Sequence, residues 1–287
     1  MIVCEPTSGL TSRIYVISDA YELAKKYGHK LVIIWNKTAD CNCRYDQVFD
    51  DRQFEDVETN IIECNRFCCK IKELMNHICV KSIIKTLKEI FVRILYLVKH
   101  TIIIGIYRVR CDIYKNFYLD NNELFDEKKA IGNSCFFEAY NVITGNGSLK
   151  SILFKHEFIF EANSIVGSLC GNCIGVHIRR TDHRLAKTVS TTAKFVTRMK
   201  QEVLKNPNVC FFVSTDDVKE QEALQKVFDK KIVSQPQKVL NRDTWDGIHC
   251  SIIDVLCLSK TKYILGSNAS VFSKFAAEYG SKDLFVM

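Results

Sequence analysis

A short apolar run that ends abruptly in charge limits the fold of this chain more than any other feature. The run begins at Cys173 and ends in His177-Ile178-Arg179-Arg180-Thr181-Asp182. An apolar run without alternation is typical of a parallel strand, which is buried on both faces. The charged residues then follow its carboxyl end, where open α/β sheets bind ligands. Arginine suits a diphosphate there, because its planar guanidinium makes bidentate, permanently charged contacts with phosphate oxygens.

Strands and helices alternate regularly after residue 165. Strands are predicted at 173–178, 209–213, 231–233 and 263–265, and helices at 192–204, 218–228, 247–258 and 270–279. Such alternation predicts a doubly wound α/β lobe. Near the start of the chain, a β-α-β unit is predicted from a strand at 2–4, a helix at 12–27 and a strand at 30–35. We therefore expect two α/β lobes, over residues 1–164 and 165–287.

The net charge of the chain limits the classes of partner that it can be expected to bind. Its 287 residues include 40 Lys and Arg against 33 Asp and Glu, a net charge of +7. This dispersed excess fits an anionic substrate or a membrane surface and argues against nucleic acid. Met1-Ile2-Val3-Cys4 runs directly into a loop, without the basic and apolar regions of a secretion signal. We therefore expect a cytoplasmic protein.

The fourteen cysteines could serve disulfides, a metal or plain packing. Without a secretion signal stable disulfides are disfavoured, and free cysteine commonly acts as a small buried hydrophobe. Cys170-Gly171-Asn172-Cys173 has the spacing of a zinc knuckle, to which Cys64, Cys68 and Cys69 could add ligands. Structural zinc usually needs a second well-spaced pair, and none is obvious in the sequence. Packing is the favoured interpretation, and no metal site is expected.

The segment 83–107 has apolar residues at helical spacing between basic residues. Those charges make a membrane-spanning helix a poor fit. A basic amphipathic helix could lie on a membrane that carries a lipid-linked acceptor, which would make the protein peripheral to that membrane. A helix that packs on its own lobe shows the same spacing and is the favoured interpretation.

Motifs in the second half of the chain resemble those of a known family. His177–Asp182 resembles the His-x-Arg-Arg-x-Asp motif of the GDP-fucose-dependent fucosyltransferases, a superfamily with α-1,6- and O-fucosyltransferases, and is nearest to the α-1,6 enzymes. Phe212–Asp217 is similar to their second motif. Ile253–Ser259, followed by Gly266–Ser273, is similar to their third. The order of the motifs makes the resemblance more specific than any one of them.

The first lobe carries a weaker part of the same resemblance. Ser8–Arg13 is similar to the Gly-Leu-Gly-Asn-Arg loop that opens many bacterial relatives. A tryptophan strand and a Cys-Asn segment follow that loop in them, as Trp35 and Cys41-Asn42 do here. The stretch 51–160 has no counterpart, so the acceptor side of the protein is the part that the resemblance leaves open.

The resemblance implies a GT-B architecture, in which two Rossmann-like lobes face a central donor cleft. The C-terminal lobe would hold most of the sugar nucleotide. Arg179 would bind the β-phosphate and Arg180 would help to hold the donor or the cleft, while His177 and Asp254 would meet the guanine. The remaining donor-binding residues that the resemblance implies are Arg13, Thr215, Asp216, Ser267, Asn268 and Ser270.

The reaction expected from these residues uses no metal. Asp216-Asp217 is not an Asp-x-Asp metal motif, so we expect no cofactor apart from the GDP-sugar co-substrate. Arg179 would stabilise the charge that grows on the leaving diphosphate.

The catalytic base is the open part of this chemistry. Inverting transfer needs a base on the acceptor hydroxyl, and the chain has Lys187 where the α-1,6 enzymes have a glutamate. Asp182 is the candidate catalytic partner of Arg179, with His183 and Glu5 as substitutes. A base-free, dissociative route is the alternative.

Three classes of function follow. The leading hypothesis is an inverting glycosyltransferase that moves fucose or a related sugar from a GDP-sugar to a glycan or glycoconjugate acceptor. The second is a nucleotide-sugar-binding or scaffold protein of the same fold, favoured by the missing glutamate. The third and least favoured is a cysteine-rich zinc-binding interaction protein.

Overall fold

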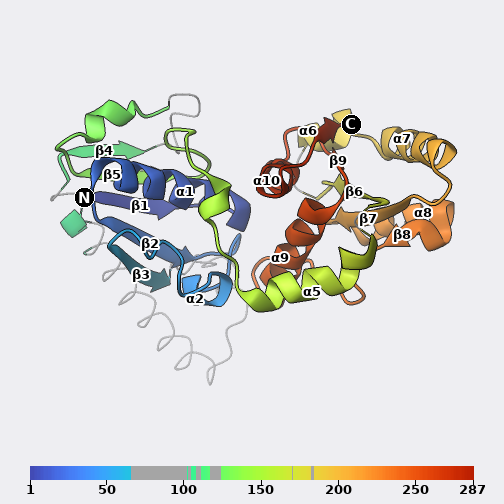
Figure 1. Cartoon of the computed structure of the whole chain (residues 1–287), viewed down its shortest axis with the longest axis horizontal. Coiled ribbons are helices and arrows are strands. Elements are labelled where there is room, and N and C mark those ends of the chain that lie inside the picture. The colour runs from blue at the N-terminus through green and yellow to red at the C-terminus, as the bar shows by residue number, and fades with distance from the viewer. Residues whose placement is uncertain (66–101, 103–104, 108–110, 117–123, 170, 182–183) are drawn as a thin grey trace, which may run out of the picture. The chain divides into compact units, whose positions relative to one another are not determined.

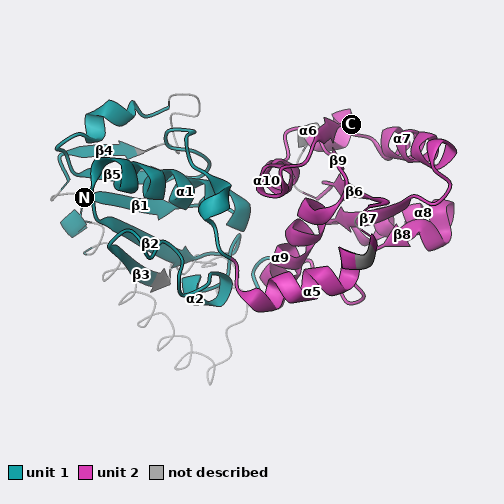
Figure 2. Cartoon of the chain, in the orientation of Figure 1, with its two compact units in different colours: residues 1–153, 242–244 teal, residues 154–241, 245–287 magenta. Residues whose placement is uncertain are grey.

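A computed structural model describes residues 1–65, 102, 105–107, 111–116, 124–169, 171–181 and 184–287 (Figure 1). These residues form two compact units, one of residues 1–153 with 242–244 and one of residues 154–241 with 245–287 (Figure 2). Each unit contains a five-stranded sheet in which every pair of neighbouring strands is parallel. The predicted α/β class with two Rossmann-like lobes is confirmed.

The first unit is built around β1 (Ile2–Pro6), the central strand of the order β3-β2-β1-β5-β4. Its helix α1 (Leu10–Tyr27) leads into the neighbouring strand, as the predicted β-α-β unit requires. The left-handed φ of 65° at Gly28 ends the helix without strain. Among the described residues of this unit the other elements are β2 (Leu31–Lys37), α2 (Tyr45–Val48), β3 (Thr59–Asn65), β4 (Ile113–Asn116), β5 (Cys135–Ala139) and the 3₁₀ turns Glu127–Ala130 and Leu149–Ser151.

Helix α1 carries a carboxylate that organises the loop after β5. Asp19 is 1% exposed. Its Oδ2 accepts the backbone N–H groups of Ile143 (2.6 Å), Thr144 (2.9 Å) and Gly145 (3.0 Å). Its Oδ1 accepts that of Gly147 (2.5 Å), where a Cβ would lie only 2.7 Å from the same oxygen. One side chain thus satisfies the backbone donors of a loop more than a hundred residues away, a role that was not predicted from the sequence.

The second unit is built around β6 (Cys173–Ile178), the central strand of the order β10-β9-β6-β7-β8. The chain runs outward from β6 through two strands on one side and then crosses to the other side, so the switch point lies between β6 and β9. The other strands are β7 (Cys210–Thr215), β8 (Ile232–Val233), β9 (Ile264–Gly266) and β10 (Leu284–Val286). The helices are α5 (His156–Val166), α6 (Arg184–Val189), α7 (Thr192–Lys205), α8 (Val218–Phe228), α9 (Trp245–Lys260) and α10 (Val271–Gly280), with 3₁₀ turns at Gly167–Leu169 and Asp229–Lys231.

The two faces of β6 are covered differently. Ile174, Val176 and Ile178 belong to a core cluster that includes residues of α7 and α8. Gly175 lies on the opposite face, where a Cβ would approach Thr261 Oγ1 to 2.7 Å, just beyond α9. Side chains alternate along a strand, so residue 177 also points to this second face.

The two units divide before α5, between residues 153 and 154, whereas the sequence pattern predicts a boundary between residues 164 and 165. Helix α5 packs on α9 through Phe158, whose ring centroid lies 6.2 Å from that of Trp245. The short segment 242–244 returns to the first unit, where Asn42 Nδ2 donates to the carbonyl oxygen of Asp243 (2.8 Å). These long-range contacts give no signal in the local sequence.

Most of the described cysteines are buried, which supports the packing interpretation. Cys4, Cys135, Cys173 and Cys257 are completely buried, and all four are free thiols. Burial raises the pKa of Cys135 to about 11, which keeps that thiol protonated. Within the described ranges no group of three or more His, Cys, Asp or Glu side chains could hold a metal ion. Part of the proposed zinc set, Cys68, Cys69 and Cys170, lies outside those ranges.

No helix in the described part of the chain combines the length and apolar character needed to cross a membrane. Most of the segment 83–107 lies outside the described residues. Its peripheral membrane contact therefore stays a prediction.

Candidate active site

The charged cluster after β6 lies at the carboxyl edge of the second sheet. Arg179 follows the last residue of β6 directly. The neighbouring strand β7 ends at Thr215, and Ser267 follows the end of β9 on the other side. Three adjacent parallel strands thus bring their ends to one edge beside the switch point, which is the position that the sequence predicted for a ligand.

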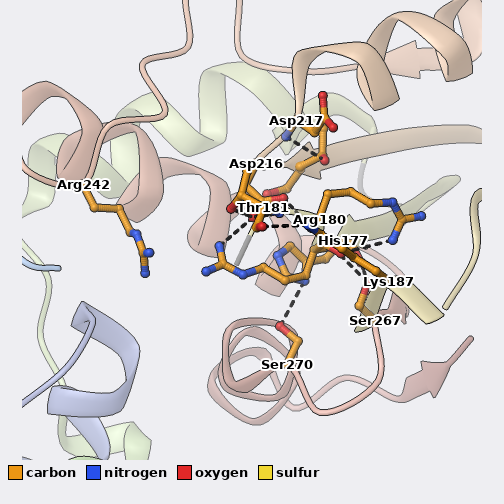
Figure 3. A network of polar contacts seen from close by, with 12 residues as sticks. His177, Arg180, Thr181, Lys187, Asp216, Asp217, Arg242, Ser267 and Ser270 are labelled. Atoms are coloured by element: carbon orange, nitrogen blue, oxygen red, sulfur yellow. Dashed lines mark hydrogen bonds and ion pairs between the residues drawn. The ribbon is translucent and has the colours of Figure 1, made fainter. Parts of the chain in front are cut away.

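Arg179 is held by an ionised carboxylate. Its Nη1 lies 2.8 Å from Asp216 Oδ2, and the two side chains are 21% and 18% exposed. Asp216 also accepts the backbone N–H groups of Arg180 (2.6 Å) and Thr181 (3.1 Å) and the Thr181 hydroxyl (2.6 Å; Figure 3). Burial acts to raise the pKa of Asp216, but the Thr181 hydrogen bond and the charge of Arg179 outweigh it and lower that pKa. Asp216 therefore fixes the turn after β6 and orients Arg179.

Arg180 has a different environment from its neighbour. It is 9% exposed, and its Nε donates to Glu220 Oε1 on α8 (2.5 Å). Nη1 donates to the carbonyl oxygen of Ser190 (2.9 Å), and Nη2 to Thr192 Oγ1 (3.3 Å). The Ser190 hydroxyl in turn accepts the backbone N–H of Asn268 (2.7 Å). Arg180 therefore ties α6, α7 and α8 to β6, which is a structural role.

His177 points from the second face of β6 toward α10. Its ring is 5% exposed and stacks on Phe272 with centroids 4.9 Å apart and planes at 29°. Nδ1 lies 3.4 Å from Ser270 Oγ (Figure 3). Burial, reinforced by the charge of Arg179, lowers the pKa of His177 to about 3. The imidazole is therefore neutral at physiological pH and acts as a packed, hydrogen-bonding group.

The low pKa of His177 predicts an acid-sensitive stability. Between about pH 6.5 and 3 the unfolded chain takes up a proton at this residue and the folded chain does not, so stability falls as the pH falls. In His177→Asn that contribution is absent, and the loss of stability below pH 6.5 should be shallower by about 1.4 kcal/mol per pH unit. Urea unfolding from pH 4.5 to 8 measures the free energy of unfolding of both proteins. The prediction is wrong if the difference in this free energy between wild type and His177→Asn does not change with pH.

Ser267 and Ser270 lie on the loop between β9 and α10. Ser267 Oγ accepts the backbone N–H of Arg179 (3.0 Å) and donates to the carbonyl oxygen of His177 (3.3 Å). Ser270 is the N-cap residue of α10 and makes no side-chain cap hydrogen bond. The first N–H groups of a helix lack helical partners and carry partial positive charge, which favours an anion. This geometry suits the phosphate contact predicted for Ser270.

Asp254 lies on α9, is 2% exposed, and has partners within the chain. Its Oδ2 accepts the Ser214 hydroxyl (2.6 Å), its Oδ1 accepts Gln235 Nε2 (2.5 Å), and Lys238 forms an ion pair with Oδ2. The resemblance implied that this carboxylate meets guanine. Sequence reasoning missed Gln235 and Lys238, which lie in a polar link without a recognisable motif.

Two further residues from the sequence prediction, Thr215 and Lys187, lie near this edge. Thr215 is 3% exposed and its hydroxyl accepts the backbone N–H of Asp217 (3.2 Å). Lys187, at the position of the missing glutamate, is exposed and donates from Nζ to the carbonyl oxygen of Thr181 (2.8 Å). Asp182 lies outside the described residues, as does His183, so the catalytic base stays a prediction.

Two predicted residues belong to the first unit. Arg13 is completely buried over the Trp35 ring (5.1 Å to its centroid), and donates to the carbonyl oxygens of Ser8 (2.7 Å) and Asn36. Glu5 is also fully buried, and its Oε1 accepts Asn36 Nδ2 (2.7 Å). Within this unit Arg13 holds the loop after β1 against β2.

Solved structures that share this architecture include fucosyltransferases. The fucosyltransferase NodZ from Bradyrhizobium is 12% identical over 96% of this chain and 91% of its own, with a TM-score of 0.56. NodZ α-1,6-fucosyltransferase soaked with GDP-fucose is 13% identical over 97% of this chain and 92% of its own, with a TM-score of 0.57. POFUT1 in complex with GDP-fucose is 10% identical over 99% of this chain and 97% of its own, with a TM-score of 0.56. No protein-family model matches the sequence, and neither does any curated protein. The chain therefore shares the GT-B-like fold of these fucosyltransferases.

Proposed function

We propose that the protein is an inverting, metal-independent glycosyltransferase that moves fucose or a related sugar from a GDP-sugar to a glycan or glycoconjugate acceptor. The observation that carries the proposal is Arg179, a largely buried guanidinium at the switch point, oriented by Asp216 at 2.8 Å. The shared fold with proteins crystallised with GDP or GDP-fucose supports the choice of donor.

In the proposed reaction, the acceptor hydroxyl attacks the anomeric carbon from the face opposite the diphosphate. The bond between that carbon and the β-phosphate oxygen breaks, and negative charge grows on the leaving GDP. Arg179 stabilises this charge as a fixed cation, and the N-terminal N–H groups of α10 after Ser270 add donors. Asp182, the candidate base from the sequence motif, accepts the hydroxyl proton. Asp216 is engaged by Arg179 and Thr181, which supports charge neutralisation without a metal.

A nucleotide panel followed by an activity assay tests this function. GDP and GDP-fucose should raise the melting temperature, because a ligand at 100 times its Kd stabilises the folded state by about 2.7 kcal/mol. UDP and CDP should not. GDP release from GDP-fucose with glycan acceptors should change by less than about twofold on adding EDTA, since arginine supplies the positive charge. Equal shifts in melting temperature with all nucleotides would contradict the proposal that the donor is a GDP-sugar. Loss of activity on adding EDTA would contradict metal independence.

The second candidate is a nucleotide-sugar-binding protein without turnover. It is favoured by Lys187, whose ammonium lies at the place where the resemblance expects a carboxylate and is bound to the Thr181 carbonyl oxygen (2.8 Å). Both candidates bind GDP-fucose, but only the enzyme releases GDP from it. A melting-temperature shift without GDP release across a panel of acceptors would favour the binding protein.

A further inference from the structure

Lys238 lies at the same sheet edge as Arg179, one strand away. Its Nζ donates to the carbonyl oxygen of Thr215, the last residue of β7 (2.8 Å). Thr215 is the register partner of Ile178, which directly precedes Arg179. A nucleotide whose diphosphate binds Arg179 would therefore extend over an edge where Lys238 is a neighbouring cation.

Lys238 also covers the carboxylate that was expected to bind the base. Asp254 accepts hydrogen bonds at both oxygens, from Ser214 (2.6 Å) at Oδ2 and from Gln235 (2.5 Å) at Oδ1, and Lys238 is bound to Oδ2. The side chain of Asp254 is 3% exposed, and that of Lys238 is 13% exposed. Of this ion pair, Lys238 is thus the residue whose side chain is more open to an approaching ligand.

An ammonium group has three donors and no acceptor. Among the described residues, Lys238 uses them for the Thr215 carbonyl oxygen and for Asp254, which leaves one donor for a ligand. Such a donor pairs with a keto oxygen or a ring nitrogen, as lysine does with O6 and N7 of guanine. It opposes the exocyclic amino group of adenine, which is itself a donor.

We propose that Lys238 reads the base of the nucleotide donor by donating to the keto oxygen of an oxopurine, and so selects oxopurine over aminopurine nucleotides. This inference rests on the proposed function, since it assumes a nucleotide diphosphate at Arg179. It differs from recognition by Asp254, which would accept from the N1 and 2-amino hydrogens of guanine and would require Lys238 to move away.

The purine series GDP, IDP and ADP separates these two modes with the unaltered protein. Hypoxanthine keeps the keto oxygen and lacks the 2-amino group, whereas adenine lacks the keto oxygen. Calorimetric Kd values for IDP should lie within about threefold of GDP, and ADP should bind at least about tenfold more weakly. If IDP binds tenfold or more weakly than GDP, the proposal is overturned in favour of recognition by Asp254. Binding of none of the three would instead refute the proposed function.

Variants test the residue itself. Lys238→Met alone leaves a buried carboxylate without its cation and risks unfolding, so it is combined with Asp254→Asn. The double variant should bind GDP and ADP within about threefold of each other, whereas Asp254→Asn alone should keep the preference for GDP. A preference that survives in the double variant would overturn the proposal.

Lys187→Met is the matched control for charge. Lys187 also donates to a backbone carbonyl oxygen at 2.8 Å, that of Thr181, and lies in the same unit. Its removal should weaken the binding of GDP, IDP and ADP by a common factor, because its charge acts on the phosphates that all three share. A GDP/ADP ratio that changes as much in Lys187→Met as in the double variant would show that net charge, and not Lys238, sets the preference.

Discussion

Arg179→Ala is expected to lower GDP release from GDP-fucose by about 10²–10³-fold, the usual effect of removing a group that stabilises transition-state charge. The loss should fall mainly on kcat, because the charge that Arg179 neutralises grows as the bond breaks. Asp216 keeps its three hydrogen bonds from Arg180 and Thr181, so the turn after β6 should stay in place. Steady-state kinetics, with a melting curve for each protein, measure both effects.

Two further variants sharpen this result. Arg179→Lys should restore little activity, because an ammonium group cannot make the bidentate contact of a guanidinium with phosphate. Arg52→Ala is the matched control, because Arg52 forms a similar ion pair with Asp50 (2.8 Å) on the exposed surface of the first unit. It should retain wild-type kinetics. Activity in Arg179→Ala equal to that of Arg52→Ala would remove Arg179 from the mechanism.

Asp19→Ala is expected to destabilise the first unit by about 3 kcal/mol or more. The charged carboxylate accepts the backbone N–H groups of Ile143, Thr144, Gly145 and Gly147. Hydrogen bonds to a charged group contribute about 1.5–3 kcal/mol each and are not additive, and a buried donor left without a partner costs its desolvation. Asp19→Asn should recover only part of the loss, since its NH₂ group faces other donors.

Urea unfolding followed by tryptophan fluorescence can test this prediction in one unit. The chain has two tryptophans. In a Trp245→Phe background the remaining fluorescence comes from Trp35 and reports the unfolding of the first unit. Glu22→Ala is the control on the same helix and should cost less than about 0.5 kcal/mol. Gly147→Ala should destabilise the same unit independently, because its Cβ would lie 2.7 Å from Asp19 Oδ1. Equal stabilities of Asp19→Ala and Glu22→Ala would refute the role of the buried carboxylate.

Most of the second sheet could be predicted because its strands are signalled within a few residues. The run that ends at Ile178 is buried throughout, and the predicted strands near 209–213 and 263–265 correspond to β7 and β9. Strand β10 and helices α5 and α6 were not predicted. α5 carries Phe160, which is 68% exposed, beside buried Phe158, so its apolar residues alone do not show which side packs.

The candidate site could be predicted in position but only partly in role. Parallel strands present their carboxyl ends at one edge, so residues after β6, β7 and β9 had to meet there. The adjacent Arg179 and Arg180 look equivalent in the sequence. They differ in the structure because Arg180 is pinned by Glu220, forty residues away, while Arg179 pairs with Asp216.

The sequence by itself determined the α/β class, the central strand β6 and the charged edge that follows it, because burial of a strand leaves its pattern in consecutive residues. Only the tertiary structure decided which charged groups are used inside the fold. Asp19 meets a loop 124 residues away at Ile143, and Asp254 meets Gln235 and Lys238 from another element. A buried charge needs partners at hydrogen-bond distance, and folding, not sequence spacing, brings such partners together.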